Sequence, residues 1–284
     1  MIKESILNVN KALSRTLISL ADYVINPYRG CTFGCIYCYT QYNKNILKKK
    51  EKWGDFIEIK KDIPLLLDKE LKLISPKKVL MGSTTEIFQY PELKYGITQK
   101  ILEILKSHNI PFVILTKSYL IKDFAHILSY HPSNKIYFTF MFSDENIRKL
   151  FEPNDSSLER RKEAISALLK NNVNTKIHIG PFIPYTDDLA NLFSLIPDGI
   201  KDVQIEIYNS KVGNISNLVS MVKDKISIDT AKKIEEVYRS KENYDLFVED
   251  TKKEADLVNK KHGFNINIVV PRFDSCYNNN EIKY

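Results

Sequence analysis

The sequence NPYRGCTFGCIYC, residues 26–38, is the stretch around which the rest of the chain is organised. It contains three of the four cysteines, Cys31, Cys35 and Cys38, in the spacing C-x3-C-x2-C. Two glycines in the same run give the backbone the freedom that a tightly wrapping loop needs. Such a loop can bring three thiolates to one metal centre, and it leaves one coordination position open for another molecule.

The choice of metal is argued from the ligands. Thiolates select zinc or iron–sulfur clusters. Structural zinc sites are closed by four ligands, usually in two separated pairs, and this chain has no second C-x2-C pair. A [4Fe–4S] cluster held by three thiolates therefore fits the loop better. Zinc closed by Cys276 or by a histidine, and a redox role of the cysteines, are the alternatives.

Length and composition limit the class of protein. The 284 residues suffice for one large α/β domain or two small ones. The net charge of +7 permits an anionic partner without requiring one, and solvated lysines are the simpler explanation. We find no signal peptide and no apolar run of about 20 residues, so we expect no membrane association. Three clustered cysteines favour a reducing cytoplasm over a disulfide scaffold.

Strand-like and helical segments alternate along the chain. Such alternation predicts a parallel sheet with right-handed crossovers. Six units are too few for a closed eight-stranded barrel, so we expect an α/β fold, a partial (β/α)6 barrel that is open on one side. The cysteine loop follows the first strand, at the end where βα proteins place their chemistry. The strands are expected at residues 23–26, 79–82, 111–115, 135–141, 175–180 and 203–208.

Several connecting segments carry expectations of their own. One helix is expected from Glu92 to His108, where isoleucines recur at helical spacing. Ser156-x-x-Glu159 has the form of a capping box that begins another helix. The charged run at 48–52 is interpreted as a solvated loop. An apolar helix face is expected from Leu65, Leu66, Leu67, Leu71 and Leu73.

We divide the chain into three parts. Residues 1–20 form an arm or a helix, 21–210 form the barrel core, and 211–284 form a C-terminal helical extension and tail. Residues 209–217 are expected to be a loop, and a last strand is expected near residues 264–270. The tail carries Cys276, and the extension is expected to cover the open barrel.

Polar residues follow the second and third predicted strands. Ser83-Thr84-Thr85-Glu86 ends one of them, and Thr116-Lys117-Ser118 ends the other. Side chains at these strand ends are candidates for binding the hydroxyl or amino groups of a ligand. The ammonium group of Lys117 is suited to a carboxylate or a phosphate, and a solvated lysine at a turn is the alternative.

The cysteine spacing, with Tyr37 just before the last cysteine, resembles the signature of radical S-adenosylmethionine (radical SAM) enzymes. The flanking sequence, Asn-Pro-Tyr-Arg-Gly-Cys before the loop and Cys-Tyr-Thr after it, is similar to the spore photoproduct lyase-related branch. The resemblance covers about residues 20–210. Three further motifs look like this branch: Thr116-Lys117-Ser118, Phe151-Glu152-Pro153 and Pro181-x-Ile183-Pro184.

The resemblance implies a [4Fe–4S] cluster ligated by Cys31, Cys35 and Cys38, with S-adenosylmethionine bound at the fourth iron. One electron from the reduced cluster would then release a 5′-deoxyadenosyl radical, which abstracts hydrogen from a substrate. An electron donor such as flavodoxin or ferredoxin is implied as a partner. Cofactor contacts are implied for Ser83, Thr85, Glu86, Lys117 and Ser118, and for the backbone of Tyr37, although ordinary packing is the alternative for this tyrosine.

One departure from the branch concerns catalysis. Spore photoproduct lyases carry a cysteine at the end of the second strand, which returns a hydrogen atom to the substrate radical. This chain has Ser83 in the matching stretch, and a serine O–H is a far poorer hydrogen-atom donor than a thiol. Two residues are still candidates for a catalytic role. One is Ser83, in the matching stretch, and the other is Cys276, if the tail folds into the pocket. Nucleic acid, peptide and small molecule stay open as substrates. A zinc- or cluster-stabilised binding or electron-transfer protein without SAM chemistry is the alternative function.

Overall fold

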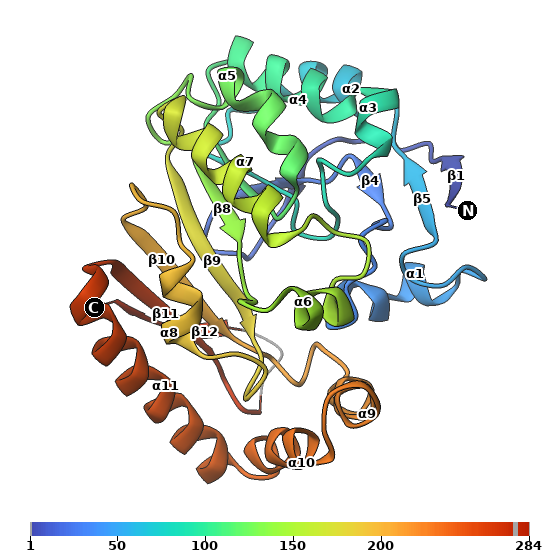
Figure 1. The fold of residues 1–284 in the computed structure, drawn as a ribbon. Helices are drawn as coiled ribbons and strands as arrows, with labels where there is room; N and C mark the ends of the chain where they lie inside the picture. The colour runs from blue at the N-terminus through green and yellow to red at the C-terminus, as the bar shows by residue number, and fades with distance from the viewer. Residues whose placement is uncertain (1, 275–277, 284) are drawn as a thin grey trace. The chain divides into compact units, whose positions relative to one another are not determined.

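The computed structural model describes residues 2–274 and 278–283 of the chain (Figure 1). The chain forms two compact units. The first unit comprises residues 1–34, 44–138 and 154–175, and the second comprises 35–43, 139–153 and 176–284. The predicted division into arm, core and extension stays a prediction.

The main sheet of the first unit is parallel except at one edge. Its strands pair in chain order, so that Ile25 lies opposite Met81 and Met81 lies opposite Ile114. All three side chains are buried, as expected for strands covered on both faces. The four parallel strands are β3 Tyr23–Ile25, β6 Val79–Met81, β7 Phe112–Thr116 and β8 Lys135–Thr139, and β2 Ser14–Arg15 pairs antiparallel with β3.

A small second sheet in the first unit was not predicted. Its strands lie in the order β1 (Lys3–Ile6), β5 (Phe56–Ile59) and β4 (Tyr28–Arg29). All four residues of β5 are buried, including Glu58, whose carboxylate is neutralised by Arg29 and by Lys49. The N-terminal segment is thus a short strand rather than a helix.

Seven helical segments follow the strands of the first unit. The helix that was predicted as continuous from Glu92 to His108 is broken at Gly96, which has a left-handed φ of 58°. The break allows the Glu92 carboxylate to accept hydrogen bonds from the backbone N–H groups of Thr98 (2.9 Å) and Gln99 (3.0 Å), which begin the second helix. The segments are α1 Lys44–Leu47, α2 Ile63–Leu71, α3 Pro91–Tyr95, α4 Ile97–Ser107, η2 Tyr119–Phe124, α5 Ala125–Leu128 and α7 Leu158–Lys170.

Two other details of the helices differ from the predictions. The N-cap of α7 is Ser157, whose hydroxyl accepts from the N–H of Arg160, so the capping box predicted at Ser156 was wrong by one residue. The predicted leucine face was also partly wrong. The side chain of Leu65 is 61% exposed, and Leu73 lies beyond the end of α2 and is 85% exposed.

The second unit contains three parallel strands and an antiparallel edge strand. β9 (Thr175–Phe182) pairs with β10 (Asp202–Ile207), which pairs with β11 (Asn265–Pro271), and β12 (Asn278–Lys283) closes the edge. β9 continues two residues beyond the predicted end. The helices are η1 Tyr39–Tyr42, α6 Glu145–Phe151, α8 Leu189–Ser194, α9 Ile215–Lys225, α10 Ile228–Val237 and α11 Lys241–His262.

The C-terminal helices pack within the second unit. The N–H that begins α8 at Leu189 donates to Glu254 of α11 at 2.8 Å. The loop predicted at 209–217 ends early, because Asn214 caps α9 through the N–H of Asn217. In the part of the chain that the structure describes, we find no helix of the length and apolarity that crossing a bilayer requires. The strands are mostly parallel and alternate with helices, so the predicted α/β class is confirmed.

Candidate functional site

The first part of the cysteine loop is tied to the end of β6. Asn26, which follows β3, donates from its amide nitrogen to the Ser83 hydroxyl at 3.1 Å. Its amide oxygen accepts from the backbone N–H of Thr84 at 3.3 Å. One asparagine thus joins the carboxyl ends of two neighbouring parallel strands, and it does so at the start of the loop.

The residues after β6 also hold the backbone on both sides of Cys31. The hydroxyl of Thr85 donates to the carbonyl of Gly30 at 2.5 Å. The side chain of Gln89 accepts from the N–H of Thr32 at 2.9 Å and donates to the Thr85 hydroxyl at 3.1 Å. Gln89 is fully buried, and sequence reasoning did not identify it, because a glutamine after a strand carries no periodic signal.

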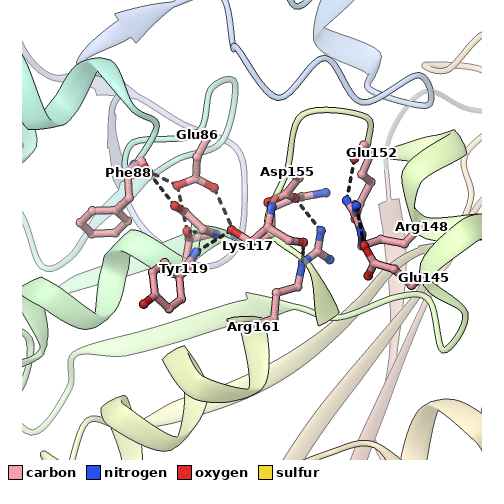
Figure 2. Close-up of polar contacts among 12 residues, drawn as sticks. Glu86, Phe88, Lys117, Tyr119, Glu145, Arg148, Glu152, Asp155 and Arg161 are labelled. Carbon is pink, nitrogen blue, oxygen red and sulfur yellow. Dashed lines mark hydrogen bonds and ion pairs between the residues drawn. The ribbon is translucent and has the colours of Figure 1, made fainter. Parts of the chain in front are cut away.

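Glu86 joins the ends of β6 and β7, as Figure 2 shows. Its carboxylate accepts from the Thr116 hydroxyl at 2.8 Å and from the backbone N–H groups of Phe88 at 3.0 Å and Lys117 at 3.1 Å. Burial raises the pKa of Glu86, and the three hydrogen bonds oppose that rise. Glu86 therefore acts within the protein as a clamp between two strand ends.

The other residues of the first unit that are predicted to contact a cofactor differ in how exposed they are. The hydroxyl of Ser118 is buried, donates to the carbonyl of Phe88 at 2.6 Å and accepts from the N–H of Leu120 at 3.2 Å. The polar groups of Ser118 and Glu86 thus have partners inside the protein. Ser83 and Lys117 are only half-buried. A role of any of these residues in binding a cofactor stays a prediction.

Two glycines of the loop allow close backbone contact. Gly30 has a φ of +90°, and a Cβ atom there would lie 2.6 Å from the carbonyl oxygen of Phe56. Gly34 has a φ of +63°, and its Cβ would lie 3.2 Å from the α-carbon of Gly54. Side chains rarely adopt such backbone angles. The loop therefore lies directly against residues 54–56.

In the second unit, α6 holds the later part of the loop. The N–H of Ile36 donates to the carbonyl of Phe151 at 3.0 Å, and the hydroxyl of Tyr37 donates to Glu152. Arg148 donates to the carbonyl of Glu152 at 2.7 Å and pairs with Glu145 at 2.9 Å (Figure 2). Both Tyr37 and Glu152 are buried. The side chain of Tyr37 thus packs the loop against α6. A contact of its backbone with a cofactor stays a prediction.

A histidine and a glutamate lie on neighbouring strands of the second unit. Nε2 of His178 in β9 is 3.6 Å from a carboxylate oxygen of Glu206 in β10. A Cβ on Gly180 would lie 2.3 Å from the same nitrogen, so any side chain at this position would displace the imidazole. Sequence reasoning treated His178 as a core residue and did not single out Glu206.

The three cysteines of the loop are largely shielded from solvent. Cys31 and Cys35 are buried and Cys38 is half-buried. Among residues 2–274 and 278–283, no three His, Cys, Asp or Glu side chains are gathered closely enough to hold one metal ion. A cluster takes one thiolate per iron, so its ligands do not converge on a single point. The donor set of three thiols in one glycine-containing loop fits such a cluster. Cys276 lies outside the described residues.

Comparisons with known proteins give a consistent result. The sequence profile of the Radical SAM superfamily matches residues 25–196. An uncharacterized protein of Methanocaldococcus jannaschii is 29% identical over 179 residues, which cover 63% of this chain and 67% of the relative. An uncharacterized protein of Mycobacterium tuberculosis is 22% identical over 174 residues, which cover 58% of this chain and 51% of the relative. The chain thus spans about half the length of the mycobacterial relative.

Solved structures of spore photoproduct lyase have a similar fold. A variant with bound AdoMet and dinucleoside spore photoproduct has a TM-score of 0.63 at 15% identity, and the match covers 92% of this chain and 81% of that one. Another variant gives a TM-score of 0.64 at 14% identity, with coverage of 93% and 80%. At these identities the likeness concerns the fold alone.

Proposed function

The chain belongs to the radical SAM superfamily, and from this premise we propose that it cleaves S-adenosylmethionine reductively at a [4Fe–4S] cluster. The radical so generated would abstract a hydrogen atom from a substrate. The observation that carries the proposal is the C-x3-C-x2-C loop, which lies inside the matched segment. Gln89 and Thr85 fix its backbone around Cys31, and α6 fixes its backbone after Cys35.

The cluster would be held by Cys31, Cys35 and Cys38. When bound, it supplies the electron that breaks the sulfonium carbon–sulfur bond of S-adenosylmethionine. The chain's own part is to hold three sulfurs in a fixed loop and to shield them from water. The hydrogen bonds that Thr85 and Tyr37 donate and that Gln89 accepts serve the first task, and the burial of Cys31 and Cys35 serves the second.

Two groups of residues serve S-adenosylmethionine in this proposal. Ser83 and Lys117 are half-buried at the ends of β6 and β7, and they would contact the cofactor directly, with the Lys117 ammonium pairing with the methionine carboxylate. Thr85, Glu86 and Ser118 are buried, and they would position the backbone at the ends of these strands through their hydrogen bonds. The likeness in fold to spore photoproduct lyase supports testing this arrangement.

The substrate of the proposed reaction is the next question. Spore photoproduct lyase has been solved with a dinucleoside spore photoproduct, so nucleic acid is the first class to test on this chain. The stretch Ser83-Thr84-Thr85 matches the one in which that lyase branch carries a hydrogen-donating cysteine, and it contains no cysteine, while a serine O–H is a far poorer hydrogen-atom donor than a thiol. We therefore propose a reaction that ends differently from thymine-dimer repair.

The test is anaerobic reconstitution with iron and sulfide, followed by reduction with dithionite and an assay for 5′-deoxyadenosine. Wild type is compared with Cys35→Ala, and Cys276→Ala serves as the matched cysteine control, because a hydrogen atom returned to the substrate radical comes after 5′-deoxyadenosine has formed. We expect product from wild type and from the control, and none from Cys35→Ala. Bound zinc, or a cluster that leaves S-adenosylmethionine intact, would contradict the proposal and favour a binding or electron-transfer protein.

A further inference from the structure

Thr32, the residue after Cys31, carries a hydroxyl that the fold itself does not use. Thr32 is only 2% exposed. Within the residues that the structure describes, its Oγ1 atom has no hydrogen-bond partner. A buried hydroxyl without a partner costs free energy, and such groups are uncommon in native proteins. The hydroxyl therefore indicates an acceptor that the protein binds.

The backbone of Thr32 is held on both sides. Its N–H donates to the side chain of Gln89 at 2.9 Å, and its carbonyl accepts from the side-chain amide of Asn154 at 3.0 Å. The N–H of Asn154 also donates to the carbonyl of Phe33 at 3.4 Å. Because threonine is branched at Cβ, its χ1 angle is restricted as well. The hydroxyl is thus kept beside Cys31 and away from water.

Other polar side chains beside Cys31 do bind within the protein. The hydroxyl of Thr85 donates to the carbonyl of Gly30, and the carboxamide of Gln89 uses both its oxygen and its nitrogen. The local packing therefore satisfies polar groups where the protein supplies a partner. The hydroxyl of Thr32 differs from them, although it is buried to the same degree.

The position of Thr32 indicates the kind of acceptor. It directly follows a cysteine that is proposed to ligate the cluster. Hydrogen bonds to the sulfur atoms of an iron–sulfur cluster are among the factors that set its reduction potential. A buried water molecule is the alternative acceptor, but it needs about two to four polar partners. The polar groups of Thr85 and Gln89 already bind the protein, so a cluster sulfur is the better candidate.

We propose that Thr32 raises the reduction potential of the cluster, because its hydroxyl donates a hydrogen bond to a cluster sulfur. This inference rests on the proposed function, which supplies the cluster. Reduction adds one electron, and with it one negative charge, to the cluster. A hydrogen-bond donor stabilises the more negative state more strongly. Thr32 is thus a positioned donor that eases the electron transfer with which the reaction begins.

The test compares wild type with three variants. Thr32→Val removes the hydroxyl and keeps the branched shape, whereas Thr32→Ser keeps the hydroxyl. Tyr244→Phe is the control, because it also removes one buried hydroxyl. Tyr244 is 3% exposed, and its hydroxyl donates to the carbonyl of Pro271 at 2.8 Å. Each protein is reconstituted with iron and sulfide, and the iron per chain is measured.

The first readout is the reduction potential, measured by a redox titration followed by EPR without S-adenosylmethionine. We expect Thr32→Val to lower the ratio of reduced to oxidised cluster about tenfold at a fixed potential, which is a shift of about 59 mV to more negative values for one electron. Thr32→Ser and Tyr244→Phe should keep the wild-type potential. If Thr32→Val takes up too little iron, Thr32→Ala removes the same hydroxyl and is titrated in its place.

The second readout is urea denaturation before reconstitution. A hydroxyl without a partner does not stabilise the protein that lacks a cluster, so Thr32→Val should unfold at the same urea concentration as wild type or at a higher one. Tyr244→Phe breaks a hydrogen bond within the protein, so it should unfold at a lower concentration. A lower midpoint for Thr32→Val would show that the hydroxyl already binds the protein, and it would overturn the proposal.

The titration has two further outcomes that would overturn the proposal. An unchanged potential in Thr32→Val would assign the hydroxyl to a water molecule. Equal shifts in Thr32→Val and in Thr32→Ser or Tyr244→Phe would show that shape or stability, and not the hydroxyl, is the cause.

Failure of the proposed function is distinguished by the assay for 5′-deoxyadenosine. A cluster whose potential depends on the Thr32 hydroxyl, but which leaves S-adenosylmethionine intact, would contradict the proposed function and support the role of Thr32. Cleavage by wild type with equal potentials in wild type and Thr32→Val would overturn only the role of Thr32. Bound zinc in wild type would contradict both.

Discussion

The carboxylate of Glu86 accepts a hydrogen bond from the backbone N–H of Lys117 at 3.1 Å, which fixes the end of β7 against the end of β6. The same carboxylate accepts from Phe88 and from the Thr116 hydroxyl. Glu86 thus positions the backbone of the lysine that follows the strand, and its contact with a cofactor stays a prediction. Its value to the protein lies in accepting three hydrogen bonds without donating any.

Glu86→Gln tests this relationship. The amide has one acceptor oxygen, and its NH2 group would face a backbone N–H, so we expect the free energy of unfolding to fall by about 1–3 kcal/mol. Urea denaturation measures this change, and Glu103→Gln on the exposed face of α4 is the control. Reconstituted Glu86→Gln should also bind S-adenosylmethionine more weakly. Equal stability of the two variants would contradict the clamp.

Tyr37→Phe tests the attachment of the cysteine loop to α6. The change removes the hydroxyl that donates to Glu152, a side chain with no exposed surface. We expect a loss of roughly 1–3 kcal/mol in the free energy of unfolding and less iron per chain after reconstitution, because the loop is less ordered. Tyr90→Phe, at an exposed tyrosine, is the control. Unchanged iron content and stability would show that the hydroxyl does not hold the loop.

The sequence predicts the buried strands well, because strands covered on both faces are almost continuous apolar runs. β6, β7 and β10 lie within a residue of their predicted positions. β5 escaped prediction because Glu58 interrupts its apolar residues. That carboxylate is acceptable in a buried strand only because Arg29 and Lys49 neutralise it, and no periodic pattern reveals such partners.

In the candidate site, too, local sequence patterns reveal some residues, and others depend on distant partners. Spacing alone predicts the three cysteines as cluster ligands, since all of them lie in one short segment. The groups that hold the loop come from distant positions. Gln89 binds the backbone of Thr32, and Glu152 binds Tyr37 across 115 positions of the chain. These contacts arise from tertiary packing, so a glutamine or a glutamate carries no local signal of its role.

Lys60 gives a prediction about pH. Its ammonium donates to the carbonyl of Asn26 at the start of the cysteine loop at 2.9 Å. Burial, with Arg29 nearby, lowers the pKa of Lys60 to about 8. Between pH 8 and the ordinary lysine value of 10.5, the unfolded chain keeps a proton that the folded chain has lost, so stability rises with pH in this window.

The measurement is urea denaturation of wild type and Lys60→Met from pH 7 to pH 10.5. We expect the stability of wild type relative to the variant to rise across the window by roughly 1–3 kcal/mol, after allowance for partial exposure of the ammonium. Lys61→Met, at the exposed neighbour, should show no such rise relative to wild type. A flat or falling difference for Lys60→Met would contradict the lowered pKa.

The ion pair of Arg161 with Asp155 gives the largest expected effect on stability. The two side chains have no exposed surface, and their charged atoms are 2.6 Å apart (Figure 2). Arg161→Met leaves the Asp155 carboxylate buried without its cation, which costs about 3–5 kcal/mol. Asp155→Asn combined with Arg161→Met should lose less than Arg161→Met alone, because no charge then stays buried. Urea midpoints for the three proteins, with Arg160→Met as the exposed control, measure this order, and a double variant less stable than Arg161→Met would contradict it.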